Sequence, residues 1–226
     1  PDPVIRRQIP HYLIDVLDPA DAYSCARFRV DALAHMQKIR AQNKIPLLVG
    51  GTMLYFRSIQ FGIAAIPAVD PKIREKLTQL AKSQGLGSLY ARLEQVDPKA
   101  AMRIHAHDPQ RIIRALEVYE AGHKPLSDYW SDNEPDANWN WIKIVVAHEN
   151  KALRNSQIAT RFQDMLGKGL VEEVENLRKR TDLSVDLPAM RSVGYRQVWR
   201  YLDGLYDFTH MQEKAVTATR QLAKRQ

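Results

Sequence analysis

The sequence predicts an α/β protein, with a parallel sheet flanked by helices and an all-helical insertion. Two short runs, 45–49 and 141–147, are apolar in the manner of buried strands. Between them the pattern changes to short amphipathic helices. The 226 residues suffice for one large domain or a domain with a smaller insert. We therefore expect 1–66 and 139–226 to form the α/β core and 67–138 to form the insertion.

The first part of the core should contain a strand, a helix and a second strand. Residues 11–17 (HYLIDVL) are typical of a strand and follow a Pro- and Arg-rich loop over 1–10. Residues 23–42 place apolar side chains on one helical face. The run 45–49 then forms the second strand. This order is typical of the right-handed crossover unit of a parallel sheet.

Gly50, Gly51 and Thr52 follow this second strand and precede a helical segment. Glycines let the backbone approach a ligand closely, and free N–H groups at a helix start bind anions. The hydroxyl of Thr52 can contact a ligand or cap the helix. The alternative is a tight turn into a capped helix with no ligand, because the spacing of a phosphate-binding loop, G-x-x-x-x-G-K-S/T, is absent here.

Helix-start signals divide the insertion. Asp-Pro pairs at 70–71 and 108–109 each place a capping side chain before a proline at the first helical position. These helices should end near Gly85 and Gly122. After the strand at 141–147, helical spacing predicts further helices at 151–166, 171–177, 187–200 and 212–226.

Composition limits the partners and the compartment. Lys and Arg number 33 against 26 Asp and Glu, and the net charge of +7 favours a polyanionic partner. A single cysteine, Cys25, excludes an internal disulfide framework and fits a reducing compartment. No apolar run approaches the roughly 20 residues of a membrane span. We expect a monomer of the cytoplasm. We also expect a piece of a longer protein, because the chain starts at Pro1 and its last residues, LAKRQ, resemble an unfinished helix.

The stretch DPQRIIR is the first candidate for contact with a polyanion. Helical spacing places Ile112 and Ile113 toward the core and Gln110, Arg111 and Arg114 on the other side. Arginine binds phosphate through two N–H groups, and a glutamine amide can bind a base edge. The alternative is a solvated helix face without a ligand.

Two further basic clusters lie in the C-terminal part. In PAMRSVGYR, Arg191 and Arg196 bracket a glycine and Tyr195, which favours RNA contact by stacking and phosphate binding. The alternative is a loop that enters a helix, with Tyr195 in the core. The last stretch, 213–226, carries basic side chains that no acid balances after Glu213. Such a run is usually a solvated face, but as the third basic cluster it favours a polyanion contact.

Arg161 differs from these clusters because it lies in the predicted core. An arginine directed at a sheet crevice suits a phosphate-transfer site, and a surface arginine is the alternative. His105 and His107 form an H-x-H pair that can bind a metal, but the missing third ligand favours a loop role. The sequence has no usable Ser/His/Asp set and no H-E-x-x-H or C-x-x-C motif.

Four stretches taken together, LLVGGTMLYF, DPQRIIRALEVYEAGHKPLS, LPAMRSVGYRQVW and ATRQLAKRQ, resemble the tRNA dimethylallyltransferase family. The resemblance runs from about His11 to the last residue. It implies transfer of a dimethylallyl group from dimethylallyl diphosphate to N6 of the adenosine 3′ of the tRNA anticodon (position 37). It also implies a P-loop kinase-like core, a helical insertion that grips the anticodon stem-loop, and Mg²⁺ in the intact enzyme.

The resemblance also assigns roles to residues. Its glycine-glycine-threonine motif matches Gly50, Gly51 and Thr52, with the threonine at the target nucleotide as a catalytic and tRNA-binding residue. Its catalytic arginine, beside the diphosphate, matches Arg161, and the arginine of its DPxR motif matches Arg74 on the tRNA side. The other positions that the resemblance places near tRNA are Gln110, Arg111, Ile112, Ile113, Arg114, Arg191, Ser192, Val193, Gly194, Tyr195, Arg196, Lys224, Arg225 and Gln226.

The chain departs from the family pattern near its start. The phosphate-binding loop and the aspartate proposed as general base are not present, and Asp15 and Asp18 follow a later strand and do not match that aspartate. The family's tail after KRQ is missing as well. We therefore expect an enzyme truncated at both ends, whose present residues alone are inactive. Two alternatives stay open: a non-catalytic RNA-binding module, and a prenyltransferase of free adenine nucleotides, which would not need the helical insertion.

Overall fold

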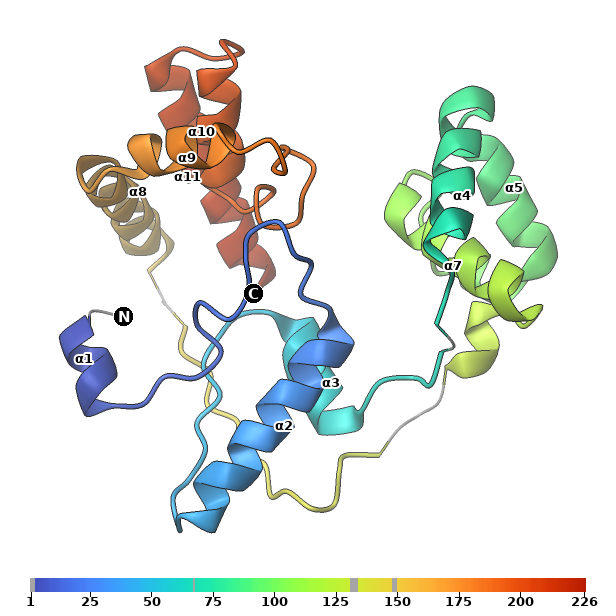
Figure 1. Cartoon of the computed structure of the whole chain (residues 1–226), viewed down its shortest axis with the longest axis horizontal. Helices are drawn as coiled ribbons and strands as arrows, with labels where there is room; N and C mark the ends of the chain where they lie inside the picture. The colour runs from blue at the N-terminus through green and yellow to red at the C-terminus, as the bar shows by residue number, and fades with distance from the viewer. Residues whose placement is uncertain (1–2, 67, 131–133, 148–149) are drawn as a thin grey trace. The chain divides into compact units, whose positions relative to one another are not determined.

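The computed structural model describes residues 3–66, 68–130, 134–147 and 150–226. All regular secondary structure in these ranges is helical. The chain divides into two units (Figure 1). We name residues 1–60 and 137–226 the core unit, and residues 61–136 the insert unit.

The core unit is built from helices whose starts are fixed by capping side chains. Ser24, Asn150 and Asp207 each accept a hydrogen bond from a backbone N–H in the first turn of the helix that follows. The first helix lies within 1–10, where the sequence predicts a loop. The helices are α1 (Pro3–Gln8), α2 (Cys25–Ala41), α3 (Met53–Phe61), α8 (Lys151–Gly167), α9 (Leu170–Arg178), α10 (Tyr195–Leu202) and α11 (Phe208–Arg225).

The predicted parallel sheet, and with it the P-loop kinase-like α/β fold class, is wrong for this structure. None of the expected strands at 11–17, 45–49 and 141–147 forms a strand in the described part of the chain, and no backbone hydrogen bond pairs them there. Leu13 and Asp15 have φ angles of 61° and 55°. These left-handed conformations are incompatible with a continuous extended strand.

The other two runs are apolar but exposed. Ile45 keeps 92% of its surface exposed, Val49 86% and Val146 95%. A strand forms only where a neighbouring backbone supplies hydrogen-bond partners, and apolar composition by itself supplies none. Pro46 additionally lacks the N–H that a ladder would use. These two segments therefore have the composition of strands, but the sequence pattern could not establish whether a neighbouring strand pairs with them.

Two apolar clusters stabilise the core unit. The larger cluster forms where α8, α9, α10 and α11 pack together, and the smaller one is centred on α2 and α3. Because α8 packs on α11, the helix that carries Arg161 is held against the helix that ends in Lys224 and Arg225. The buried side chains include Phe162, Val174, Val198 and Met211 in the larger cluster and Ala32, Met36 and Ile59 in the smaller one.

The insert unit contains α4 (Pro71–Gln84), α5 (Leu86–Val96), α6 (Pro98–Ala101), α7 (Pro109–Gly122) and the 3-10 helix η1 (Leu126–Tyr129). Its helices α4, α6 and α7 begin in the same way. Asp70, Asp97 and Asp108 each precede a proline and accept a hydrogen bond from a first-turn N–H. The predicted starts of α4 and α7, and their ends at Gly85 and Gly122, are confirmed.

Helix α7 packs on α4, α5 and η1 within the insert unit. Figure 1 labels α4, α5 and α7 of this unit. Leu77, Leu93 and Ile112, one from each of α4, α5 and α7, are fully buried in the shared core. The buried carboxylate of Asp97 also accepts a hydrogen bond from the N–H of Ser127 at 2.8 Å, which ties η1 to the start of α6. The exposed face of α7 is therefore presented from a well-anchored helix.

Candidate nucleic-acid interface

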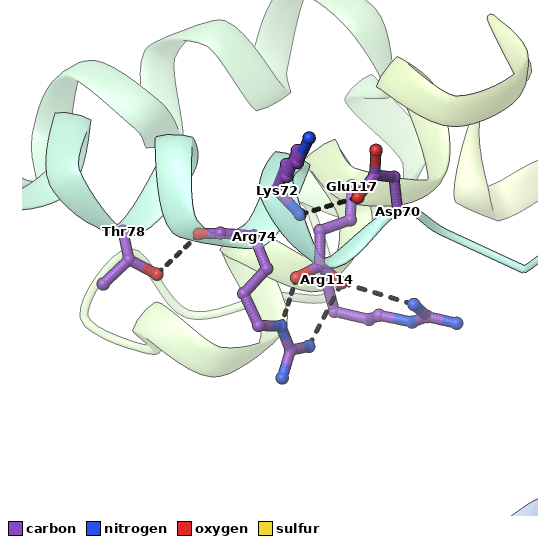
Figure 2. A network of polar contacts seen from close by, with 6 residues as sticks. All are labelled: Asp70, Lys72, Arg74, Thr78, Arg114 and Glu117. Atoms are coloured by element: carbon purple, nitrogen blue, oxygen red, sulfur yellow. Dashed lines mark hydrogen bonds and ion pairs between the residues drawn. The ribbon is translucent and has the colours of Figure 1, made fainter.

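Two arginines from different helices meet on one buried carboxylate in the insert unit (Figure 2). Glu117 on α7 is only 1% exposed. Arg74 on α4 donates to both of its oxygens, through Nε to Oε1 and through Nη2 to Oε2 at 3.1 Å. Arg114, one turn earlier on α7, donates from Nη1 to Oε2 at 3.3 Å. The carboxylate thus fixes two guanidinium groups relative to each other.

The network leaves positive charge facing solvent. A buried carboxylate requires compensation by charged hydrogen bonds, and the two arginines supply it. In return, the hydrogen bond to Glu117 raises the pKa of Arg74 above its usual value. The side chains of Arg74 and Arg114 stay 61% and 42% exposed, so that N–H groups not used by Glu117 can reach a ligand. Two cations on one anion give the site a net positive charge that suits phosphate.

The rest of the QRIIR stretch divides between the surface and the core. Gln110 and Arg111 are exposed, and Arg111 forms an ion pair with the capping residue Asp108 at 3.3 Å. Ile112 is fully buried and Ile113 is partly buried against the same core. The predicted division of this helix into a polar and an apolar face is confirmed for these side chains. Ile112 therefore acts by holding the helix in place.

A pocket of about 390 Å³ lies beside this polar face. Sequence reasoning missed two residues that line it, Arg103 and Trp130. Arg103 precedes α7 and Trp130 follows η1, so neither shares a sequence period with the basic stretch; only the packing of the helices brings them together. The described residues that line it are Arg103, Ile104, Gln110, Arg111, Arg114, Leu126 and Trp130.

The RSVGYR stretch in the core unit has a largely structural centre. Gly194 has a φ of 99°, which favours glycine, and its N–H donates to the side-chain oxygen of Gln197 at 2.9 Å. Tyr195 packs against the larger apolar cluster, and its hydroxyl donates to Glu173 at 2.5 Å. Burial, together with that bond, raises the pKa of Tyr195 to about 12. These contacts match the alternative of a helix-entry loop for Tyr195, whose phenol already has a protein partner.

The flanking residues of this stretch are more accessible. Arg191 and Ser192 are exposed, while Val193 and Arg196 are partly buried. Within the described ranges, the guanidinium groups of Arg191 and Arg196 form no hydrogen bond or ion pair. Both therefore stay candidates for contact with phosphate.

The structure brings the glycine-glycine turn and the end of α11 together. A side-chain carbon added at Gly51 would collide with the amide of Gln226. Thr52 is exposed just before α3, and its carbonyl accepts a hydrogen bond from the N–H of Tyr55 at 2.9 Å. Lys224 and Arg225 in the last turn of α11 are exposed as well. Gly51 and Gln226, far apart in sequence, are therefore neighbours in the core unit.

Arg161 lies on the exposed side of α8, next to Phe162, which anchors the helix in the larger cluster. No acidic partner holds its guanidinium among the residues that the structure describes. An arginine that no carboxylate neutralises keeps its full charge for an anionic ligand.

Residues 1–226 match the family model described as IPP transferase. The chain belongs to the IPP transferase family. The tRNA dimethylallyltransferase of Alkalilimnicola ehrlichii is 50% identical over 226 residues, which are 100% of this chain and 71% of that protein. The tRNA dimethylallyltransferase of Thioalkalivibrio sulfidiphilus is 49% identical over 227 residues, with the same coverage of 100% and 71%. The full-length tRNA isopentenylpyrophosphate transferase of Bacillus halodurans has a similar structure, with a TM-score of 0.66 at 28% identity, covering 100% of this chain and 70% of that one.

In this IPP transferase, the residues that the family resemblance assigns fall in both units. The structure brings them together at two places: Arg74 with Arg114 through Glu117, and Gly51 with Gln226. The roles of the individual residues stay predictions. The insert unit carries Arg74 and 110–114, and the core unit carries Thr52, Arg161, 191–196 and 224–226.

The Mg²⁺ that the family resemblance implies has no cluster of candidate protein ligands among the described residues of this IPP transferase. No group of three or more His, Cys, Asp or Glu side chains there could hold a metal ion. Nδ1 of His105 instead accepts a hydrogen bond from the backbone N–H of His107 at 3.1 Å, a local loop contact. The expected Mg²⁺ stays a prediction, and we derive no step of the reaction through it. None of the described helices is long and apolar enough to cross a membrane.

Proposed function

We propose that this IPP transferase moves a dimethylallyl group from dimethylallyl diphosphate to N6 of the adenosine 3′ of the tRNA anticodon. The observation that carries the proposal is 50% identity to a tRNA dimethylallyltransferase along the whole chain. A tRNA acceptor is supported by the insert unit, because α7 presents exposed arginines from a well-anchored helix. The net charge of +7 suits a polyanion such as RNA.

In the proposed reaction, the adenine N6 nitrogen attacks the allylic carbon that carries the diphosphate. A C–N bond forms, the C–O bond breaks with its electron pair leaving on the diphosphate, and N6 gives one proton to a base. Arg161 would stabilise the charge that develops on the diphosphate. Thr52 would hold the acceptor nucleotide. We assign the base to no residue of the described chain.

The acceptor adenine has to leave the anticodon stack to reach a reactive carbon. Contacts to phosphate can hold the RNA in register while one base is turned outward. Arg74, Arg111 and Arg114 would make such contacts from the insert unit, and Lys224 and Arg225 from the core unit. The exposed arginines of the helical insert unit favour RNA over a free adenine nucleotide, which would need no such insertion.

The test is transfer of a labelled dimethylallyl group by the natural gene product. We expect label on an anticodon stem-loop with adenosine at the acceptor position, none on the same RNA with guanosine there, and little on free AMP. Label on AMP with an equal kcat/KM would support the free-nucleotide alternative. Binding of the stem-loop with no transfer at all would support the non-catalytic RNA-binding module.

Arg111→Ala should weaken binding of the anticodon stem-loop about three- to tenfold and make it less dependent on salt. Loss of one phosphate contact lowers the slope of log affinity against log salt by about 1. Fluorescence anisotropy over a salt series measures both quantities. Lys82→Ala is the matched control, because Lys82 is an exposed cation on α4 that does not line the pocket. An unchanged slope in Arg111→Ala would contradict a phosphate contact.

A further inference from the structure

The pocket beside α7 has two kinds of wall. Ile104 is buried and Leu126 is partly buried, and they give it an apolar floor. The indole of Trp130, which is 39% exposed, adds an aromatic wall. Gln110 and Arg111 contribute polar groups. The volume of about 390 Å³ lies within the range of small-molecule sites.

Trp130 is held in place from two directions. The guanidinium of Arg103 lies over the indole ring, 4.6 Å from its centroid. The backbone N–H of Trp130 donates to the carbonyl of Ser127 at 3.2 Å, and Ser127 is itself tied to the buried carboxylate of Asp97. The ring is therefore positioned before any ligand arrives, which lowers the entropic cost of stacking on it.

The charges around the pocket select the class of ligand. Arg103, Arg111 and Arg114 all line it, and none of the described lining residues is acidic. Glu117 further restrains Arg114. An aromatic wall with an apolar floor suits a flat heterocycle, and the surrounding guanidinium groups suit phosphates attached to that ring. The amide of Gln110 can hydrogen-bond the edge of a base.

We infer that this pocket binds an unpaired nucleotide of the RNA substrate, other than the acceptor adenosine, with its base against Trp130 and its phosphates at the arginines. The inference rests on the proposed function, because the occupant is part of the tRNA. The residues predicted to act on the acceptor, Thr52 and Arg161, belong to the core unit and do not line this pocket. Binding in this pocket would require an unpaired base, so the pocket would favour the single-stranded anticodon loop over paired RNA.

The test is a coupling experiment between the ring and single nucleotides. Trp130→Leu keeps an apolar side chain but removes the stacking surface, and we expect about tenfold weaker binding of the stem-loop with an unchanged salt slope. Trp130→Phe should recover most of the affinity. Circular dichroism melting establishes that both variants are folded. In contrast, Arg103→Gln should weaken binding and lower the salt slope.

Abasic substitutions scanned through the loop then identify the occupant. At one loop position other than the acceptor, removing the base should weaken binding of the RNA to the natural protein about tenfold. The Trp130→Leu variant should bind this abasic RNA and the intact RNA with equal affinity. Equal losses in both proteins at every loop position would overturn the inference. If the ring and one nucleotide are coupled but no dimethylallyl group is transferred, the inference about the pocket is supported and the proposed function is overturned. If the group is transferred but no nucleotide is coupled to the ring, the proposed function is supported and the inference about the pocket is overturned.

Discussion

Arg161→Ala should lower kcat for dimethylallyl transfer by a factor of about 10² to 10³, with the affinity for tRNA changed less than about twofold. Removing one preorganised donor to a developing negative charge typically has an effect of this size. Arg161 is exposed on α8 and has no acidic partner in the described ranges, so its loss should leave the fold intact. Single-turnover transfer with labelled donor measures the chemical step, and filter binding measures tRNA affinity.

Two further variants make the Arg161 result specific. Arg161→Lys keeps the charge but loses the planar guanidinium, and we expect it to recover only part of the rate. Lys151→Ala removes an exposed cation from the same helix and should leave the rate within about twofold. If Arg161→Ala loses tRNA affinity and rate in equal proportion, the arginine binds RNA and the role at the diphosphate is excluded.

Glu117→Gln should weaken binding of the anticodon stem-loop about fivefold, although it removes a negative charge from a site proposed to bind RNA. The natural carboxylate accepts hydrogen bonds from Arg74 and Arg114 and holds them in one arrangement. A glutamine offers one oxygen and turns an NH₂ group toward a guanidinium, so the two arginines lose that arrangement. A change of about 1 kcal/mol in binding corresponds to roughly this factor. An account based on net charge alone predicts the reverse, tighter binding with a steeper salt slope.

The same substitution should also lower the free energy of unfolding by about 2 kcal/mol, since charged hydrogen bonds to a buried group are lost. Urea denaturation measures this, and binding is compared at a temperature at which the variant is folded. Glu120→Gln is the matched control: Glu120 lies on the same helix and pairs with Arg92 at 2.6 Å, away from both arginines of the network. Equal or tighter RNA binding by Glu117→Gln would refute the positioning role.

Local features of the insert unit followed from the sequence because each depends on a few adjacent residues. Asp70 and Asp108 cap helices whose first residue is proline, and the capping bonds span two or three residues. The alternation of Gln110, Arg111 and Arg114 with buried Ile112 is likewise a property of one helix. The motifs that indicate the family are also short stretches of adjacent residues. The match of residues 1–226 to the IPP transferase model confirms the family.

The error about the sheet came from a long-range requirement. The runs 45–49 and 141–147 have the composition of strands, yet strand formation needs a second backbone at hydrogen-bonding distance. In the described part of the chain neither run has one, and Ile45 and Val146 stay exposed. The composition of a segment indicates how much free energy its burial would contribute. It does not indicate whether another segment packs against it.

For this protein, the residues in order were enough to establish the limits of α4 and α7, the polar and apolar faces of α7, the excess of positive charge and the family. They did not establish the start of α10, which begins at Tyr195 and not at the predicted 187, or the presence of α1. They were not enough to establish which charges are neutralised and which are presented. Glu117 accepts a hydrogen bond from Arg74 of another helix, Tyr195 donates one to Glu173, and the guanidinium of Arg103 contacts the ring of Trp130. Each pair joins segments separated in the chain, and its geometry depends on how whole helices pack. Packing is a sum over many weak contacts, so these pairs appear only when the tertiary structure is known.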